Sequence, residues 1–173
     1  QGVGIDASGD IYVADSGNHT IRKVTPAGLT STHAGLAGSP GSTDGAGSGA
    51  RFNAPSGVAA RPNGTLFVAD RGNSTIRRVS TTADVTTLAG MPGVAGSTDG
   101  LGSTERFTAP EGIAVDTVAS IYVADTGSGL IRIVTVGGDA TTIGGGAYAY
   151  GSADGAGSAA RFATPYADGV GCC

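Results

Sequence analysis

Several kinds of residue are scarce or missing in this sequence. It has no tryptophan and one methionine, and aromatic residues make up 5% of its 173 positions. No window places apolar residues at helical spacing over three turns, so a helical fold is not expected. No apolar run reaches the roughly 18 residues that a membrane-spanning helix needs, so we expect no membrane insertion.

Histidines and positive charges are also few. His19 and His33 are the only histidines, so a zinc site built from three or four histidines is not expected. Lys and Arg total 10 against 14 Asp and Glu, which gives a formal net charge of −4. A mildly acidic surface does not attract phosphate backbones, so no nucleic-acid partner is expected. No serine elbow, Walker loop or dinucleotide fingerprint occurs, and the sequence predicts neither an enzyme nor a cofactor.

Glycine is abundant, with 32 residues, and the chain is repetitive. The tripeptide Val-Ala-Asp ends three apolar runs at Asp15, Asp70 and Asp125, which lie 55 residues apart. Each copy holds four short runs rich in Val, Ile and Thr, and each run is bounded by Gly, Asn, Asp or Pro. Such runs are typical of strands joined by tight turns. The sequence therefore predicts an all-β fold with one four-stranded antiparallel meander per repeat.

Two features of the runs predict how the meanders pack. Leu66, Phe67 and Val68 are apolar at successive positions, which indicates a strand that is buried on both faces. The first run of each repeat consists of small residues such as Gly57 and Ala59, as expected where innermost strands converge on an axis. Sheets covered on both faces by neighbouring sheets are the arrangement of a β-propeller.

The order of the motifs resembles a known family. Pro-x-Gly-Val/Ile-Ala, then Tyr/Phe-Val-Ala-Asp, then Gly-Asn-x-x-Ile-Arg-x-Val is similar to the NHL repeat, and the likeness covers about residues 2–144 in three copies. The resemblance implies blades of a six-bladed propeller, a fold that serves scaffolds, ligand binders and a few enzymes. The third copy departs from the pattern, because residues 117–120 lack the turn glycine and Ser128 replaces asparagine. We expect a looser turn there.

The repeats divide the chain into segments 1–55, 56–110 and 111–165, and residues 166–173 would start a further strand or form a tail. Three blades are fewer than a closed propeller needs. Either the chain is part of a longer polypeptide, which we favour, or copies of it self-assemble into a ring.

Long Gly/Ser-rich connections follow each repeat, at residues 36–50, 91–105 and 145–160. Each contains Asp-Gly-x-Gly-Ser and leads into an Arg-Phe pair, and the regular recurrence favours a structural role over a single specific site. We expect the Phe side chains (Phe52, Phe107 and Phe162) to fill the seams between blades. We expect the preceding Arg side chains to anchor the connections to nearby carboxylates. Calcium binding is the alternative, although these connections lack clustered carboxylates.

The Asp at the end of each Val-Ala-Asp run is predicted to pair across its hairpin with an arginine. The three pairs are Asp15 with Arg22, Asp70 with Arg77, and Asp125 with Arg132. An exposed pair of this kind is worth about 1 kcal/mol or less. A metal-binding carboxylate cluster formed by the three Asp residues is the less favoured alternative.

Other residues suggest the environment and the contacts of the chain. Asn18, Asn63 and Asn73 begin Asn-x-Thr sequons in predicted turns and are candidate glycosylation sites. Cys172 and Cys173 are adjacent, so each is expected to pair with a cysteine elsewhere, which indicates an oxidising compartment. His19 and Arg71, in the turns after the Val-Ala-Asp runs, are candidate partner contacts.

These observations together predict a non-enzymatic structural or protein-interaction propeller module at an extracellular or cell-surface location. We expect it to be part of a larger secreted or filamentous glycoprotein. Its partners would be other proteins or further blades of the same longer chain. The alternative is a ligand-binding or enzymatic propeller, of lyase or hydrolase type, whose axial site is completed by additional blades.

Overall fold

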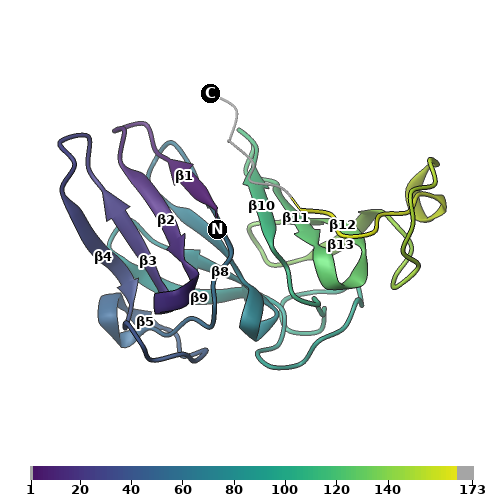
Figure 1. Ribbon diagram of the computed structural model, residues 1–173, viewed down its shortest axis with the longest axis horizontal. Helices are drawn as coiled ribbons and strands as arrows, with labels where there is room; N and C mark the ends of the chain where they lie inside the picture. Colours follow the sequence, from purple (N-terminus) through teal and green to yellow (C-terminus); the bar gives the residue numbers. More distant parts are fainter. Residues whose placement is uncertain (1, 167–173) are drawn as a thin grey trace.

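The computed structural model describes residues 2–166 and consists of three antiparallel sheets that follow one another as blades (Figure 1). The first blade contains β1 (Val3–Ile5), β2 (Ile11–Asp15), β3 (Thr20–Val24) and β4 (Thr30–Gly35). The second contains β6 (Gly57–Ala60), β7 (Leu66–Asp70), β8 (Thr75–Val79) and β9 (Asp84–Ala89), and the third contains β10 (Gly112–Val115), β11 (Ile121–Asp125), β12 (Leu130–Val134) and β13 (Ala140–Gly144). The predicted all-β fold of four-stranded meanders is confirmed.

Each blade pairs its strands in chain order, and the same irregularity recurs in the third strand. The pairing with the fourth strand shifts register between Ile21 and Arg22 in the first blade. The same shift falls between Ile76 and Arg77 in the second blade and between Ile131 and Arg132 in the third. The equivalent arginine therefore lies beside the bulge in all three blades.

The apolar core lies between the blades. One cluster joins Tyr12 and Ile21 of the first blade to Val68 of the second, and another joins Phe67 of the second blade to Val123 of the third. All five residues of β7 are buried because this strand has a sheet on each side. The prediction that the Val-Ala-Asp strands are covered on both faces is confirmed for the central blade.

The innermost strands approach one another closely, as their small residues predict. Gly57 of β6 lies so near the carbonyl oxygen of Glu111 that a Cβ atom could not be accommodated there. Ser56, just before β6, donates hydrogen bonds from its hydroxyl to the carbonyl oxygens of Pro110 and Glu111. The inner edges of neighbouring blades are therefore in direct contact.

A short 3₁₀ turn follows the second strand of each blade: η1 (Ser16–Asn18), η3 (Arg71–Asn73) and η4 (Thr126–Ser128). Each turn ends in a left-handed residue, with φ of 58° at His19, 56° at Ser74 and 71° at Gly129. In the third copy, the Ser128 hydroxyl donates to Asp125 Oδ2 at 2.6 Å and so replaces an asparagine amide.

The expected looseness of the third copy is wrong. At the hairpin that lacks glycine, Ala119 adopts φ 73°, close to the 79° of Gly9 and the 83° of Gly64. The Ala119 amide also donates to the Asp116 carbonyl at 3.1 Å, as Gly9 donates to Asp6 at 3.0 Å. The turn keeps its shape, and the strain falls on one alanine.

The Gly-rich connections are ordered and reach the next blade. In the first connection, β5 (Gly45–Ala46) pairs with β9 and is followed by η2 (Gly47–Gly49). In the second, Gly100 forms an isolated bridge with Ala140 of the third blade. The third connection contains η5 (Gly157–Ala159). Each of the first two connections thus leaves one blade and lies along the outer edge of the following one.

In the Arg-Phe pairs, the phenylalanines take the expected position in two of the three connections, whereas the arginines do not bind as expected. Phe52 and Phe107 are fully buried between blades, so the seam-filling prediction is confirmed for them, whereas Phe162 is only half-buried. The arginines do not anchor to carboxylates as expected. Arg51 donates to the carbonyl oxygens of Ser48 and Ala50, and the same local pattern recurs at Arg106 and Arg161. Each arginine therefore stabilises the backbone of its own connection by hydrogen bonds to nearby carbonyl oxygens.

Candidate functional site

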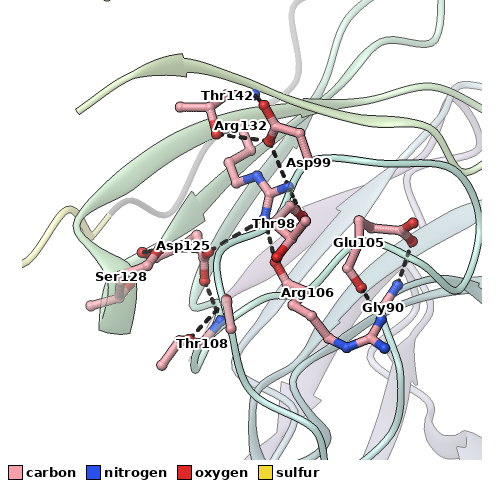
Figure 2. A network of polar contacts seen from close by, with 12 residues as sticks. Gly90, Thr98, Asp99, Glu105, Arg106, Thr108, Asp125, Ser128, Arg132 and Thr142 are labelled. Atoms are coloured by element: carbon pink, nitrogen blue, oxygen red, sulfur yellow. Dashed lines mark hydrogen bonds and ion pairs between the residues drawn. The ribbon is translucent and has the colours of Figure 1, made fainter. Parts of the chain in front are cut away.

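A buried ion pair occupies the third blade. Arg132 and Asp125 both have fully buried side chains, and Arg132 Nη1 lies 3.6 Å from Asp125 Oδ2 (Figure 2). Asp125 also accepts hydrogen bonds from the Thr108 amide at 2.7 Å and from the Ser128 hydroxyl at 2.6 Å. The carboxylate is held by the hairpin, the 3₁₀ turn and the preceding connection at once.

The same guanidinium also binds the connection that arrives from the second blade. Arg132 Nη2 donates to Asp99 Oδ1 at 2.8 Å and to the Thr98 carbonyl at 3.0 Å, and Nη1 donates to the Arg106 carbonyl (Figure 2). Asp99 in turn accepts the Thr142 amide of β13 at 2.9 Å. Arg132 therefore joins two blades through one side chain.

The second blade repeats this arrangement with its own residues. Arg77 Nη1 lies 2.9 Å from Asp70 Oδ2, and Arg77 Nη2 lies 2.7 Å from Asp44 Oδ1 of the first connection. Asp44 also accepts the Thr87 amide at 3.1 Å. The Asp70–Arg77 and Asp125–Arg132 pairs were predicted. Their burial and the second carboxylate were missed, although the 55-residue recurrence of Asp44, Asp99 and Asp154 could have revealed the latter.

The first blade is the exception. The predicted ion pair between Asp15 and Arg22 does not occur among the salt bridges within residues 2–166. Arg22 instead donates through Nε to the Ser31 carbonyl at 3.3 Å, and Asp15 accepts the Asn18 side-chain amide at 2.8 Å. Both side chains are partly exposed, and within the described residues no connection arrives from a preceding blade.

Burial has the largest effect on the pKa of the aspartate in the two ion pairs that form, Asp70–Arg77 and Asp125–Arg132. It raises the pKa of Asp125 to about 6, although hydrogen bonds from Ser128 and Thr108 and the charge of Arg132 act in the opposite direction. Burial raises the pKa of Asp70 as well. The guanidinium of Arg132 also lies 4.5 Å from the ring centroid of Phe107, so the seam phenylalanine and the ion pair form one packed unit.

Glu105 is a further buried acid that sequence analysis missed. It lies where the other repeats have Ala50 and Ala160, is fully buried, and accepts the Gly90 amide at 2.6 Å (Figure 2). Its other oxygen has no hydrogen-bond partner within the described residues. No period in the sequence marks this position, because only the second repeat has an acid there.

The carboxylates that bind Arg77 and Arg132 are not grouped into a metal centre. Asp70 and Asp125 lie in different blades, and each is bound by its own arginine. Asp44 and Asp99, from the Gly-rich connections, are bound to the same two arginines. Within residues 2–166, no three or more His, Cys, Asp or Glu side chains are grouped as a metal site would require.

A shallow groove of about 410 Å³ opens between the second and third blades, beside the 3₁₀ turns. Arg71 of η3 and Glu111 form a salt bridge of 2.8 Å on one side, with Arg71 half exposed. Tyr150 of the third connection forms another wall, and its hydroxyl donates to the Gly127 carbonyl at 2.7 Å. Arg71 was a predicted contact residue, whereas Glu111 and Tyr150 were not recognised from the sequence.

His19, the other predicted contact residue, forms a hydrogen bond within the fold. His19 is half-buried in its left-handed conformation, and its Nδ1 accepts the Ala54 amide at 3.0 Å. That bond fastens η1 to the chain segment entering the second blade, so His19 and Arg71 do not share one site. His33 lies in the outer strand β4.

The three sequons differ in accessibility. Asn18 and Asn63 are exposed in turns, and glycosylation at them stays a prediction. Asn73 is buried, and its amide nitrogen donates to the Gly41 carbonyl and to Asp70 Oδ2, both at 2.7 Å. A glycan on that nitrogen would break both bonds, so Asn73 is not a suitable acceptor in the folded chain. Cys172 and Cys173 lie outside the described residues.

No helix within residues 2–166 has the length and apolarity to cross a bilayer.

Comparison with protein families gives a match to the NHL repeat at residues 1–24 and 52–79. Over 71 residues the chain is 42% identical to Protein SUPPRESSOR OF QUENCHING 1, chloroplastic, of Arabidopsis thaliana, in a match that covers 41% of this chain and 7% of that protein. It is 36% identical over 92 residues to Teneurin-3 of Mus musculus, covering 45% and 3%. The chain therefore spans less than a tenth of the length of these relatives.

Solved structures share the fold. A protein of unknown function from Bacteroides thetaiotaomicron superposes with a TM-score of 0.74 at 20% identity, over 95% of this chain and 40% of that one. An auxiliary nutrient binding protein from Bacteroides ovatus superposes with a TM-score of 0.71 at 20% identity, over 96% and 42%. At such identities the likeness concerns the fold alone, and the chain spans about two fifths of these structures.

Proposed function

The chain is built of NHL repeats, and from that premise we propose that its three blades form a non-enzymatic propeller module that binds protein partners. The observation that carries this proposal is that the buried charged residues are paired with one another inside the fold, whereas one charged pair lies at a surface groove. The buried acids Asp70 and Asp125 are bound to arginines of the framework. The charged pair Arg71 and Glu111 instead faces the groove beside the 3₁₀ turns.

The groove has the chemistry of a protein-binding surface. Arg71 offers a half-exposed guanidinium, and Tyr150 presents a ring that is 53% exposed. Arg and Tyr are among the side chains that most often dominate the binding energy of protein interfaces, because each combines a large apolar surface with directional hydrogen bonds. Both are held in place, Arg71 by Glu111 and Tyr150 by the Gly127 carbonyl, so little side-chain entropy is lost on binding.

The proposal includes an extracellular or cell-surface location within a larger glycoprotein. It is supported by the exposed sequons at Asn18 and Asn63 and by the Cys172-Cys173 pair in the sequence. Intact-mass measurement of the natural protein, before and after reduction and deglycosylation, tests this part. Unchanged masses in both treatments would contradict it.

The second candidate is a ligand-binding or enzymatic propeller whose axial site additional blades complete. The auxiliary nutrient binding protein from Bacteroides ovatus has the same fold. In this chain the innermost strands contribute only Gly, Ala, Val and Ile, and Gly57 is in close backbone contact with the next blade. Any reactive groups on the axis would therefore come from other blades, which makes this candidate the weaker one.

The test of the main proposal compares partner binding by the wild-type chain and two variants. Each of the three proteins is used as the bait and is cross-linked to extracellular proteins from the organism that produces it. The cross-linked partners are then quantified by mass spectrometry. For at least one partner, we expect the amount recovered with the double variant Arg71→Glu, Tyr150→Ala to be lower than with the wild type by tenfold or more. Arg61→Glu, at the β6–β7 hairpin on the opposite end of the blade, serves as the control and should retain that partner.

Two results would contradict the assignment. A partner that binds all three proteins equally would place the interaction on another surface. Enrichment of no protein above an unrelated propeller bait would argue against an interaction module and in favour of the axial candidate.

A further inference from the structure

The third connection, which extends from β13 away from the sheets (Figure 1), carries two exposed tyrosines that the other connections lack. Tyr148 and Tyr150 are 50% and 53% exposed. Their counterparts, one and two repeats earlier in the sequence, are Gly38, Pro40, Gly93 and Ala95. Aromatic rings bury large apolar areas in cores and interfaces, so two exposed rings in one short segment are typical of a binding surface.

A following blade does not cover these two positions. The first and second connections are each followed by a blade, and all four counterpart residues are nevertheless exposed. The tyrosines contact the blade that they leave: the Tyr148 amide donates to the Ser128 carbonyl at 2.8 Å, and the Tyr150 hydroxyl donates to the Gly127 carbonyl at 2.7 Å. Their exposure is therefore a property of the connection, and we expect it in the presence of further blades as well.

Tyr148 adopts a backbone conformation that favours glycine. Its φ is 57°, and its counterparts Gly38 and Gly93 have φ of 72° and 76°. A left-handed backbone is unfavourable for a residue that has a Cβ atom. Because half of the Tyr148 side chain stays exposed, packing alone does not account for a tyrosine at this position. Strained residues of this kind are enriched at ligand-binding sites.

Both tyrosine rings lie beside the groove that contains Arg71. Tyr150 forms one wall of this groove. The Tyr148 hydroxyl lies 3.1 Å from the Thr108 hydroxyl, and Thr108 directly precedes the groove residue Ala109. Since both tyrosine hydroxyls are bonded to the protein, the rings are held in place and their exposed parts present apolar surface next to the groove.

The charged pair of the groove offers hydrogen-bonding groups of both kinds without a net charge. Arg71 Nε donates to Glu111 Oε1 at 2.8 Å. Neither Nη group of Arg71 nor Oε2 of Glu111 forms a hydrogen bond within residues 2–166. Donors and an acceptor therefore remain side by side. An anionic ligand would meet the charge of Glu111 and a cationic ligand that of Arg71, so a neutral ligand that both donates and accepts hydrogen bonds is favoured.

We propose that this surface binds a neutral glycan that is carried by the partner protein. A sugar ring has an apolar face of C–H groups, which matches the exposed surface of a tyrosine ring. Its adjacent hydroxyl groups each donate and accept hydrogen bonds, which matches the guanidinium and the carboxylate of the Arg71–Glu111 pair. The inference rests on the proposed function, because it uses the same groove and names the part of the partner that is recognised.

Titration of the full chain with oligosaccharides, followed by NMR, tests the proposal directly. The probes are neutral oligosaccharides that end in mannose, galactose or glucose, and sialylated forms of the galactose series, each added to about 10 mM. We expect at least one neutral probe to bind, and any sialylated form of it to bind about tenfold more weakly or less. Absence of binding by every neutral probe would overturn the proposal.

Tyr148→Gly separates a binding role from a structural one, because it restores the residue of the other two connections. It removes the ring and relieves the left-handed strain, so the melting temperature should rise or stay within about 3 °C of the wild type. The dissociation constant of the bound probe should rise about tenfold or more. Val136→Ala removes an exposed side chain at the opposite end of the same blade and should change neither value appreciably. Unchanged binding, or a larger fall in melting temperature, would overturn the assignment of Tyr148.

Glu111→Gln tests the selection of a neutral ligand. The amide keeps the size of the side chain and one acceptor oxygen, but it leaves the charge of Arg71 unopposed. We expect the affinity for the sialylated probes to increase about tenfold or more relative to that for their neutral forms. An unchanged ratio of the two affinities would overturn the role given to the Arg71–Glu111 pair.

Capture of the partner before and after glycan removal distinguishes this inference from the proposed function. Extracellular proteins are treated with enzymes that remove N- and O-linked glycans, and are then cross-linked to the wild-type chain. We expect recovery of the partner to fall by tenfold or more. Equal recovery from treated and untreated proteins would overturn the glycan inference and leave the proposed protein-binding function standing. Recovery of no partner from untreated proteins would contradict the proposed function instead, whatever the oligosaccharide titration shows.

Discussion

Asp44 and Arg77 come from different repeats, yet the carboxylate Oδ1 of Asp44 lies 2.7 Å from Nη2 of Arg77. The aspartate belongs to the connection that leaves the first blade, and the arginine belongs to the third strand of the second. The same relationship joins Asp99 to Arg132 at 2.8 Å. Blades are therefore joined by charge at the outer edge as well as by apolar packing in the core.

We expect Arg77→Ala to lower the free energy of unfolding by about 3–5 kcal/mol. The substitution leaves the fully buried Asp70 without its guanidinium, and an unpaired buried charge carries a penalty of that size. Urea denaturation followed by circular dichroism gives the value. Arg78→Ala, exposed one residue further along β8, serves as the control and should change stability by less than about 0.5 kcal/mol. Equal effects would contradict a special role for Arg77.

Phe107→Ala should destabilise the chain by about 3–5 kcal/mol, because it removes a fully buried ring from the seam between the second and third blades. It also removes the aromatic face that lies beneath Arg132. Phe107→Leu keeps most of the volume and should cost about 1.5 kcal/mol or less. Thermal unfolding of both variants separates the two effects, and a neutral Phe107→Ala would show that the ring does not fill the seam.

The carboxyl of Asp125 should titrate with a pKa of about 6 in the folded chain, raised by its burial. Since an unfolded Asp titrates near 3.9, the folded chain holds more protons at this group between roughly pH 4 and pH 6. This contribution to stability is present in full below about pH 4 and is lost as the pH rises through about 6.

Carbon-13 NMR of the Asp125 carboxyl measures this titration directly. Asp125→Asn should remove the corresponding slope from a plot of unfolding free energy against pH. A midpoint at or below about pH 4 for the wild-type carboxyl would show that Arg132 and the hydrogen bonds outweigh burial.

Ala119→Gly should stabilise the chain by about 0.5–1 kcal/mol. Ala119 adopts φ 73°, a left-handed conformation that costs a non-glycine residue about 1–2 kcal/mol, and glycine recovers more than it loses in unfolded-state entropy. Ala156→Gly is the matched control, because Ala156 has φ −93° and the same change there should destabilise the chain. Differential scanning calorimetry compares the two, and a fall in melting temperature for Ala119→Gly would contradict the strain.

The strands and two of the three hairpin ion pairs were predictable because they are local. Alternating and continuous apolar runs specify a strand within a few residues, and Asp70 and Arg77 lie on neighbouring strands of one hairpin. The burial of that pair was not predictable in the same way. It depends on residues 43–51, which arrive from another blade and cover the guanidinium.

The misassigned residues have a common cause. Arg51 was expected to seek a carboxylate, but the carbonyls of Ser48 and Ala50 lie nearer along its own chain. Asn73 was interpreted as an exposed turn residue, but the first connection passes over it and accepts its amide at Gly41. In both cases the path of a Gly-rich connection decided the outcome, and glycine-rich sequence carries little information about its own path.

The passage of each connection onto the following blade gives the array a direction. A blade receives from its predecessor the carboxylate and carbonyls that bind its arginine, and it returns apolar cover together with polar contacts near the inner edge, such as that of Glu111 with Arg71. Nearest-neighbour coupling along the chain is therefore unequal on the two sides of every repeat. Loss of an upstream repeat removes one of the two carboxylates that bind the arginine, Asp44 or Asp99, whereas loss of a downstream repeat uncovers apolar side chains and removes the partners of Ser56 and Arg71. Unfolding should accordingly spread along the array more readily from the upstream side than from the downstream side.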